Sequence, residues 1–238
     1  MNTYDDFADD YVRMVDHGLA DPHSVQSQAT DTLLTVAGSV NGLDVVDIGC
    51  GEGNLVRRLA PYARQVTGID LSTRMLAAAK ARTGASNVSY IHDDTQSLSR
   101  LARQSAHLVL CNLALMDMAD LGAVYASVYR VLRPAACFVF SITHPCFQAP
   151  DSHNEYDAEG RFVARRIIRY AQAEQWQSTN PGGVRGRVGA YHRPLSDYIN
   201  PLIATGFTLG QLVEPVLDSK PGAAEAVIPT LVVMAATK

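Results

Sequence analysis

Hydrophobic positions follow a helical period at the start of the chain and a different pattern beyond residue 40. The Tyr4–Val15 segment carries apolar residues three and four positions apart, which is typical of an amphipathic helix, and Gly18 is expected to end it. The Asp21-Pro22 pair is expected to cap and begin a second helix that runs to about Gly38. We therefore predict a helical cap or lid over residues 1–40.

Short apolar strands alternate with helical segments from residue 43 onward. The expected strands cover residues 43–49, 65–70, 89–92, 106–112 and 136–142. The helices between them are expected at about residues 53–60, 72–82 with Ser72 as the cap, and 121–132. Such alternation predicts an α/β fold in which helices cover both faces of a parallel sheet.

The alternation lapses for about fifty residues after the fifth strand. Within this gap, residues 161–170 and 184–192 are interpreted as two strands around the turn-rich segment 178–183. A helix near 195–205, ended by Gly206, and strands at 207–213 and 228–236 complete the pattern. We thus expect a single domain over 1–238, with a core over 41–143, an insert over 144–193 and a C-terminal helix with two strands over 194–238.

Composition places the chain in an ordinary class of globular protein. Hydrophobic residues make up 47% of its 238 positions, and no apolar run approaches the length needed to cross a bilayer. The acidic N-terminus is unlike a secretory signal, so a cytoplasmic location is expected. The cysteines form no CxxC pair, which favours reduced thiols over disulfides or a metal site; they are Cys50, Cys111, Cys137 and Cys146.

Charge is distributed unevenly along the chain. The formal net charge is −4, but the Arg161–Arg193 segment alone carries +6, which leaves −10 for the rest. Its arginines are Arg161, Arg165, Arg166, Arg169, Arg185, Arg187 and Arg193. A solvated strand face explains this cluster, and recognition of an anionic or carrier-bound small molecule is the alternative. The acidic balance of the whole chain and the few aromatics beside the arginines argue against nucleic acid as a partner.

A glycine-rich turn follows the first predicted strand in the sequence VVDIGCGEGNL, residues 45–55. Glycines at such a turn let a ligand approach bare backbone near a helix N-terminus. A dinucleotide fingerprint would place its third glycine at Asn54, whereas here the glycines fall at 49, 51 and 53. Asp47, two residues before them, suits a cationic ligand such as an ammonium group and would be poorly placed beside a pyrophosphate.

With this motif the sequence resembles the class I S-adenosylmethionine (SAM)-dependent methyltransferases, over nearly all of residues 43–238. The resemblance implies a Rossmann-like, doubly wound, seven-stranded sheet whose last strand is antiparallel. It also implies SAM as the cofactor, S-adenosylhomocysteine as its product, and no metal.

The resemblance assigns roles to residues at successive strand ends. VVDIGCGEG places Gly49, Cys50 and Gly51 along the methionine part of SAM, with Asp47 serving its ammonium group. GIDLS places Asp70 on the ribose hydroxyls, a role that suits a carboxylate because it can accept two hydrogen bonds. The remaining implied cofactor residues are Leu71, Met75, Asp94 and Thr95 around the adenine, Asn112 and Leu113 beside the sulfonium, and Tyr11 at the methionine carboxylate. Packing within an amphipathic helix explains Tyr4 and Tyr11 equally well.

The acceptor side is less defined by the sequence. His144, in SITHPCF just beyond the fifth strand, is the candidate general base. An orienting or loop-structuring role for His144 is the alternative. The other candidate substrate-binding residues, each with packing as the alternative role, are Tyr4, Met116, Trp176, Tyr191 and His192.

We therefore predict a SAM-dependent methyltransferase that modifies an O or N atom of a small molecule, with C-methylation still open and a role in specialised metabolism considered. The alternatives are an NAD-linked Rossmann oxidoreductase and a non-catalytic SAM-binding protein. No membrane partner is expected, and pairing of subunits into a homo-oligomer through the insert remains open.

Overall fold

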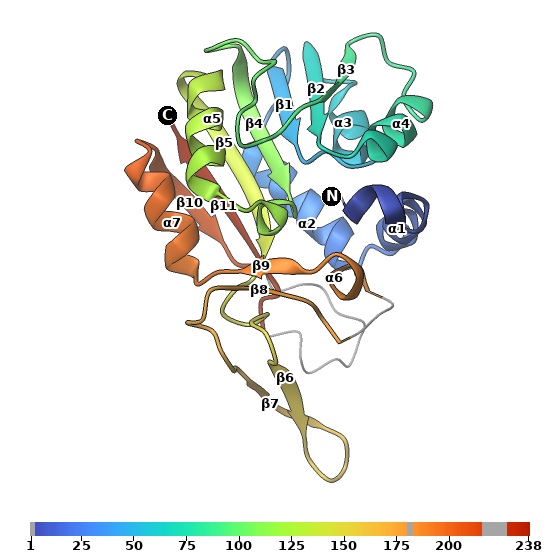
Figure 1. Ribbon diagram of the computed structural model, residues 1–238, viewed down its shortest axis with the longest axis vertical. Coiled ribbons are helices and arrows are strands. Elements are labelled where there is room, and N and C mark those ends of the chain that lie inside the picture. Colours follow the sequence, from blue (N-terminus) through green and yellow to red (C-terminus); the bar gives the residue numbers. More distant parts are fainter. Residues whose placement is uncertain (1–2, 180–182, 216–227) are drawn as a thin grey trace.

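Seven strands form the central sheet in a computed structural model that describes residues 3–179, 183–215 and 228–238 (Figure 1). The strands are β1 (Asp44–Ile48), β2 (Gln65–Asp70), β3 (Val88–His92), β4 (Ala106–Asn112), β5 (Leu132–Thr143), β10 (Thr208–Val213) and β11 (Leu231–Thr237). Their spatial order is β10-β11-β5-β4-β1-β2-β3. β1 to β5 pair in parallel, whereas β11 is antiparallel to both of its neighbours. The predicted Rossmann-like topology and reversed last strand are confirmed.

Both faces of the central strands of the sheet are buried. On β1, Val45 belongs to one hydrophobic cluster and its neighbour Val46 to another. On β5, Val139 joins the first cluster and Phe138 the second. Because successive side chains of a strand point to opposite faces, helices must cover each side, and the strands appear in the sequence as continuous apolar runs.

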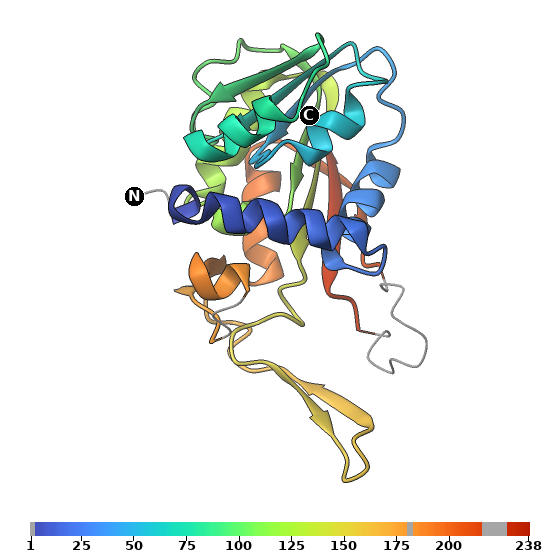
Figure 2. The same cartoon turned by 90° about the vertical axis from the view of Figure 1, so that its right-hand side faces the viewer.

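Helices supply the two covering layers. The described helices are α1 (Thr3–Ala20), α2 (Val25–Ala37), α3 (Asn54–Leu59), α4 (Thr73–Ala81), the 3₁₀ turn η1 (Leu115–Asp117), α5 (Leu121–Val131), α6 (Val184–Arg187) and α7 (Leu195–Ala204). α2, α3 and α4 pack on the face of Val45, and α5 and α7 on the face of Val46. α1 packs chiefly on α2 and α4. Figure 2 shows it lying across the molecule, with α4 above it and α6 below its N-terminal half.

The boundary between the first two helices differs from the prediction. α1 continues through Gly18 to Ala20, and α2 begins at Val25 rather than at the Asp21-Pro22 pair. The hydroxyl of Ser24 decides this boundary, because it accepts a hydrogen bond from the Ser27 amide at 3.0 Å and donates one to the Gly18 carbonyl. Ser24 therefore caps the start of one helix and satisfies the end of the other. The predicted Ser72 cap of α4 is confirmed by its 3.1 Å bond from the Met75 amide.

The insert contains two separate hairpins instead of the single strand pair that was predicted. β7 (Phe162–Arg166) pairs with β6 (His153–Tyr156), and β9 (Ala190–His192) pairs with β8 (Glu174–Trp176). Residues 184–187, predicted as strand, form the single turn α6, which the Val188 amide closes on the Val184 carbonyl at 2.9 Å. Residues 180–182 of the predicted 178–183 turn lie outside the described residues. The β6–β7 hairpin projects away from the sheet (Figure 1).

A smaller correction concerns the start of the last strand. β11 begins at Leu231 and not at Ile228, because Pro229 has no amide hydrogen to give to a neighbouring strand. All four cysteines are free thiols. Among the described helices, none is long and apolar enough to cross a membrane.

Candidate functional site

The turn between β1 and α3 has a backbone that only glycine adopts readily. Gly49, Gly51 and Gly53 have φ angles of 68°, 53° and 82°, in the left-handed region that a Cβ atom disfavours. A Cβ on Gly49 would also lie 2.6 Å from the Cβ of Ala114. The chain can therefore pass close to the end of β4 only because position 49 has no side chain.

Asp70, at the end of β2, joins this turn to the next one. One carboxylate oxygen accepts the Gly51 amide at 2.8 Å, and the other accepts the Ser72 amide at 2.8 Å. Burial raises the pKa of Asp70, and these backbone hydrogen bonds oppose the rise. Each oxygen keeps capacity for a further donor, so Asp70 can hold the turn and still receive hydroxyl groups from a ligand.

A cavity of about 400 Å³, here the first cavity, lies at the carboxyl ends of the strands. Most of the residues predicted to contact the cofactor line it. These are Tyr11, Gly49, Gly51, Asp70, Leu71, Met75, Asp94, Thr95, Asn112 and Leu113. Parallel strands bring their carboxyl ends to one edge of the sheet, which is where open α/β sheets bind ligands.

A second cavity of about 80 Å³ adjoins the first and holds Asp47 and Cys50 in its wall. Asp47 is only 2% exposed, and its Oδ1 atom has no hydrogen-bond partner among the described residues. Burial raises the pKa of this carboxyl well above its ordinary value, and the nearby charge of Asp70 adds to the rise. A buried carboxylate of this kind calls for a cationic partner.

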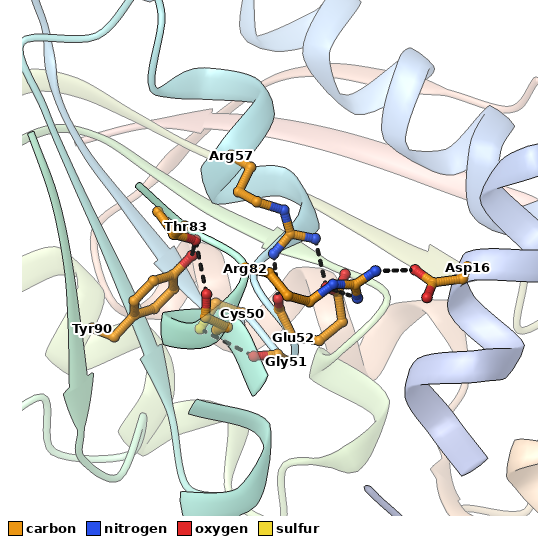
Figure 3. Close-up of polar contacts among 9 residues, drawn as sticks. Asp16, Cys50, Gly51, Glu52, Arg57, Arg82, Thr83 and Tyr90 are labelled. Carbon is orange, nitrogen blue, oxygen red and sulfur yellow. Dashed lines mark hydrogen bonds and ion pairs between the residues drawn. The ribbon is translucent and has the colours of Figure 1, made fainter. Parts of the chain in front are cut away.

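Glu52, in the wall of the second cavity, forms ion pairs with two arginines (Figure 3). Its Oε2 atom accepts hydrogen bonds from Arg57 at 2.5 Å and from Arg82 at 2.6 Å. Arg82 also donates a hydrogen bond to Asp16 of α1 at 2.6 Å. The Oε1 atom of Glu52 is buried without a partner among the described residues. The sequence analysis missed this residue, although an acid between two glycines of the turn was a usable signal.

Side chains behind the cavity wall fix the end of β4. The amide group of Asn112 donates to the Thr30 hydroxyl at 2.9 Å, and its oxygen accepts the Ser141 hydroxyl at 2.6 Å. Leu113 has a φ of 53°, and its amide lies 2.9 Å from the same Ser141 hydroxyl. These hydrogen bonds leave the backbone at this strand end as the surface that a ligand meets.

Asp94 and Thr95 form the opposite part of the wall. Asp94 Oδ1 accepts the Gln96 amide at 2.9 Å, so the carboxylate is oriented by its own loop. The Thr95 carbonyl accepts the Ser127 hydroxyl of α5 at 2.7 Å. The loop after β3 is thus anchored from two sides, and Asp94 keeps acceptor capacity for a ligand.

Helix α1 closes the first cavity through Tyr4 and Tyr11, whose rings meet edge to face at 5.4 Å. The Tyr4 hydroxyl donates to Asp117 at 2.9 Å, and Arg185 of α6 binds the other oxygen of Asp117. Burial raises the pKa of Asp117, and the guanidinium of Arg185 opposes the rise. Asp117 was missed, although it lies in the VLCNLALMDM segment that follows a strand end. Arg185 could not be placed because its contact is purely tertiary.

A third cavity, of about 110 Å³, shares Ala190 and Tyr191 with the first. It gathers the predicted substrate residues Met116, Trp176, Tyr191 and His192, whereas Tyr4 lines the first cavity. The Tyr170 carbonyl, 2.9 Å from Nε2 of His192, can only accept, so that nitrogen carries the hydrogen.

His144 lines none of the three cavities. It is 1% exposed, its Nε2 atom lies 2.6 Å from a Glu214 oxygen, and its Nδ1 accepts the Cys146 amide at 3.3 Å. One ring nitrogen therefore contacts the loop that follows β5, and the other joins that loop to the end of β10.

Comparison with known proteins agrees with this geometry. The family described as "Methyltransferase domain" matches residues 45–135. The crystal structure of a SAM-dependent methyltransferase from Mesorhizobium loti is 30% identical, with a TM-score of 0.76, over 90% of this chain and 97% of that one. The chain belongs to the SAM-dependent methyltransferases.

Two curated relatives of this methyltransferase act on different kinds of atom, as their names state. Malonyl-[acyl-carrier protein] O-methyltransferase of Pseudescherichia vulneris is 32% identical over 71% of this chain, which spans 65% of that protein's length. N-demethylindolmycin N-methyltransferase of Streptomyces griseus is 26% identical over 90% of this chain and 91% of its own. The relatives therefore agree on methyl transfer and differ in the acceptor.

The residues at the site of this methyltransferase fit SAM chemically. The bare glycine turn, the unpartnered Asp47 oxygen and the acids Asp70 and Asp94 offer acceptors and negative charge to a molecule that carries an ammonium, a sulfonium and hydroxyl groups. The same acids would repel a pyrophosphate placed against the turn.

Proposed function

We propose that the protein transfers the methyl group of SAM to an O or N atom of a small-molecule acceptor. The observation that carries this proposal is the buried Asp47 oxygen beside the glycine turn, which has no partner in the described part of the chain. That oxygen would accept the ammonium group of the methionine part, since a buried carboxylate is stabilised by a cation. The O- and N-methyltransferases among the relatives support both acceptor atoms.

The other cofactor contacts follow from the walls of the first two cavities. Asp70 would bind the ribose hydroxyls through its remaining lone pairs, and Asp94 would accept the adenine amino group. The hydrophobic contacts of the adenine would come from Leu71 and Met75, with the Thr95 backbone beside the ring. The turn residues Gly49, Cys50 and Gly51, the Asn112 and Leu113 backbone, and Tyr11 would enclose the methionine end.

SAM supplies an activated methyl group on a positively charged sulfur, so the protein mainly has to align the acceptor and exclude water. Helix α1 would exclude water, because Tyr4 and Tyr11 cover the first cavity. The contacts of Tyr4 and Arg185 with Asp117 hold α1 to the insert. The acceptor would lie where the first and third cavities meet, since the two share Ala190 and Tyr191 in their walls.

The position of His144 supports its loop-structuring role and not its role as general base. Both of its ring nitrogens have protein partners, and it is outside the cavity walls. His192 has the better position, because the Tyr170 carbonyl fixes Nε2 as the donor and leaves Nδ1 as an acceptor. A proton released by an O or N acceptor would then pass to His192.

Calorimetric titration with S-adenosylhomocysteine tests the cofactor assignment, with Asp47→Asn and Asp70→Asn as the informative variants. Binding of the ammonium favours ionised Asp47, whose pKa is raised in the free protein, so binding releases a proton. Affinity should therefore rise with pH in the wild-type protein and lose this dependence in Asp47→Asn. Asp70→Asn should weaken binding roughly tenfold or more, because charge-assisted hydrogen bonds to hydroxyls are lost.

Titration with NAD provides the competing outcome. Binding of NAD in place of S-adenosylhomocysteine would overturn the proposal in favour of the oxidoreductase. Binding of SAM without release of S-adenosylhomocysteine across a panel of hydroxyl and amine acceptors would favour a non-catalytic SAM-binding protein.

A further inference from the structure

The arginines of the Arg161–Arg193 segment have different surroundings in the folded protein. Carboxylates pair with those at positions 161, 166, 169, 185 and 187. Arg165 donates to the Phe147 carbonyl and to neutral amide oxygens. Arg193 alone of these seven combines a place in a cavity wall with no carboxylate partner among the described residues. Folding therefore pairs most of the arginines behind the charge excess seen in the sequence and leaves the charge of Arg193 at the third cavity.

Arg193 is held rigidly in that wall. Its Nη2 atom donates to the Met118 carbonyl at 2.6 Å and to the Ala119 carbonyl at 2.7 Å, and its guanidinium lies 4.8 Å from the centre of the Tyr191 ring. Its Nη1 atom is buried and has no partner among the described residues. A fixed guanidinium nitrogen with two unused hydrogens is a preformed donor for an oxyanion.

Tyr198 adds a second donor to the same wall. It is 3% exposed, and its hydroxyl oxygen lies close enough to the Arg193 guanidinium to accept a hydrogen bond from it, which leaves the hydroxyl proton for a ligand. Burial raises the pKa of Tyr198, and the nearby charge of Arg193 opposes the rise. Because a neutral phenol donates its proton, Tyr198 and Arg193 present donors to one cavity. No aspartate or glutamate lines this cavity in the described part of the chain.

The size and position of the third cavity restrict what it can hold. At about 110 Å³ it is smaller than a cavity of ~150 Å³ that accepts benzene, so it suits a short arm and not a whole ring system. Met116 and Trp176 provide apolar wall for the carbons of that arm. Since Ala190 and Tyr191 also line the first cavity, a group held here would keep the rest of its molecule beside the cofactor residues.

We propose that the third cavity binds a carboxylate on a short arm of the acceptor, with Arg193 and Tyr198 as its donors. To call the bound molecule a methyl acceptor, this inference rests on the proposed function. The anion site itself does not depend on methyl transfer. The carboxylate anchors the molecule and is not the methylated group. A separate O or N atom forms the new bond to carbon and loses its proton to His192, while the sulfur–carbon bond breaks and its electron pair stays on sulfur.

Calorimetry with matched acid and amide pairs tests the site. The probes are succinate, phenylacetate and 3-phenylpropionate, each paired with its neutral amide, together with inorganic phosphate, at millimolar concentration with and without S-adenosylhomocysteine. At least one acid should bind, roughly tenfold or more tightly than its amide, because a charge-assisted hydrogen bond is lost in the amide. Arg193→Gln and Tyr198→Phe should each weaken that acid, whereas Arg193→Lys should restore part of the affinity lost in Arg193→Gln.

Matched variants outside the cavity control for general effects. Arg166→Gln removes a guanidinium that is paired with Glu155 on the projecting hairpin, and Tyr129→Phe removes a hydroxyl beside Phe207. Both should bind the acid as the wild-type protein does. If Arg193→Gln does not fold, as judged by its thermal transition, Tyr198→Phe and Arg193→Lys decide the outcome.

Four results would overturn the proposal: no acid binds, the amides bind as tightly as the acids, phosphate alone binds, or the folded cavity variants keep wild-type affinity for the acid. Failure of the proposed function is recognised separately, by the absence of S-adenosylhomocysteine binding. In that case acid binding in the cofactor-free titration would still establish the anion site.

Discussion

The sheet and the insert of this methyltransferase are stabilised in different ways. In the sheet, strands such as β4 are buried on both faces by helices. In the insert, β7 exposes 62% of Val163, and its partner strand β6 exposes 53% of Tyr156. A central strand such as β4 is thus stabilised by apolar burial along most of its length, whereas a strand in the insert depends on a few individual contacts.

Ion pairs take the place of apolar contacts in the insert. Arg166 pairs with Glu155 across the β6–β7 hairpin, and Arg169 connects Asp151 with Glu174 near β8. Exposed pairs contribute at most about 1 kcal/mol each, so they select one arrangement among several of similar stability. The comparison teaches that a regular apolar pattern predicts structure in the sheet, while the insert is determined by which charges meet after folding.

Removal of an apolar side chain should give the largest difference in stability between the sheet and the insert. Phe138 is fully buried in an aromatic cluster with Tyr125, Phe140 and Phe207. Phe138→Ala should lower the free energy of unfolding by about 4 kcal/mol through the cavity it creates. Val163→Ala should change it by less than about 0.5 kcal/mol. Urea denaturation measures both, and equal losses would remove the distinction between the regions.

Glycine substitutions sharpen the comparison at the level of the backbone. Gly49 and Gly160 both have positive φ angles, but a Cβ would meet Ala114 at position 49 and nothing within 4 Å at position 160. Gly49→Ala should cost about 3 kcal/mol from strain and overlap together, and should abolish binding of S-adenosylhomocysteine. Gly160→Ala should cost about 1 kcal/mol from strain alone and leave binding intact. Retained binding in Gly49→Ala would contradict the role given to the turn.

The pH dependence of stability should have opposite signs at two carboxyls. Burial raises the folded pKa of Asp47 above its ordinary 3.8, so this group lowers stability as pH rises through and beyond that value. Hydrogen bonds from Arg161 lower the folded pKa of Asp157, so its contribution is present above the ordinary pKa and lost as pH falls.

Urea denaturation of the cofactor-free protein across pH checks these signs. Asp47→Asn should gain stability relative to the wild-type protein with rising pH, because it removes a buried charge. Asp157→Asn should lose stability relative to the wild-type protein at neutral pH and converge with it in acid. Parallel pH profiles for either variant and the wild-type protein would show that its carboxyl has the same pKa folded and unfolded.

Prediction from the sequence succeeded where the residues of a segment fit only one local structure. The apolar runs predicted where strands β1 to β5 lie along the chain, and the acid and glycine positions indicated residues that line the first two cavities. It failed at Asp21, where a cap was expected, because Ser24 competes for the same function three residues later. It also failed at residues 184–187, where alternating apolar and charged residues fit a strand as well as the helical turn observed.

The sequence by itself determined a parallel sheet with helices on both faces, because buried strands and amphipathic helices impose different periods on the positions of apolar residues. It also determined the glycine turn, because few residue types adopt its backbone. Only the tertiary structure decided that Arg185 meets Asp117 and that Arg187 reaches Asp10. It also decided that Arg193, at the third cavity, keeps a nitrogen with no partner among the residues that the structure describes. Such contacts join residues far apart in the chain, and the pairing of charges depends on the distances that folding creates.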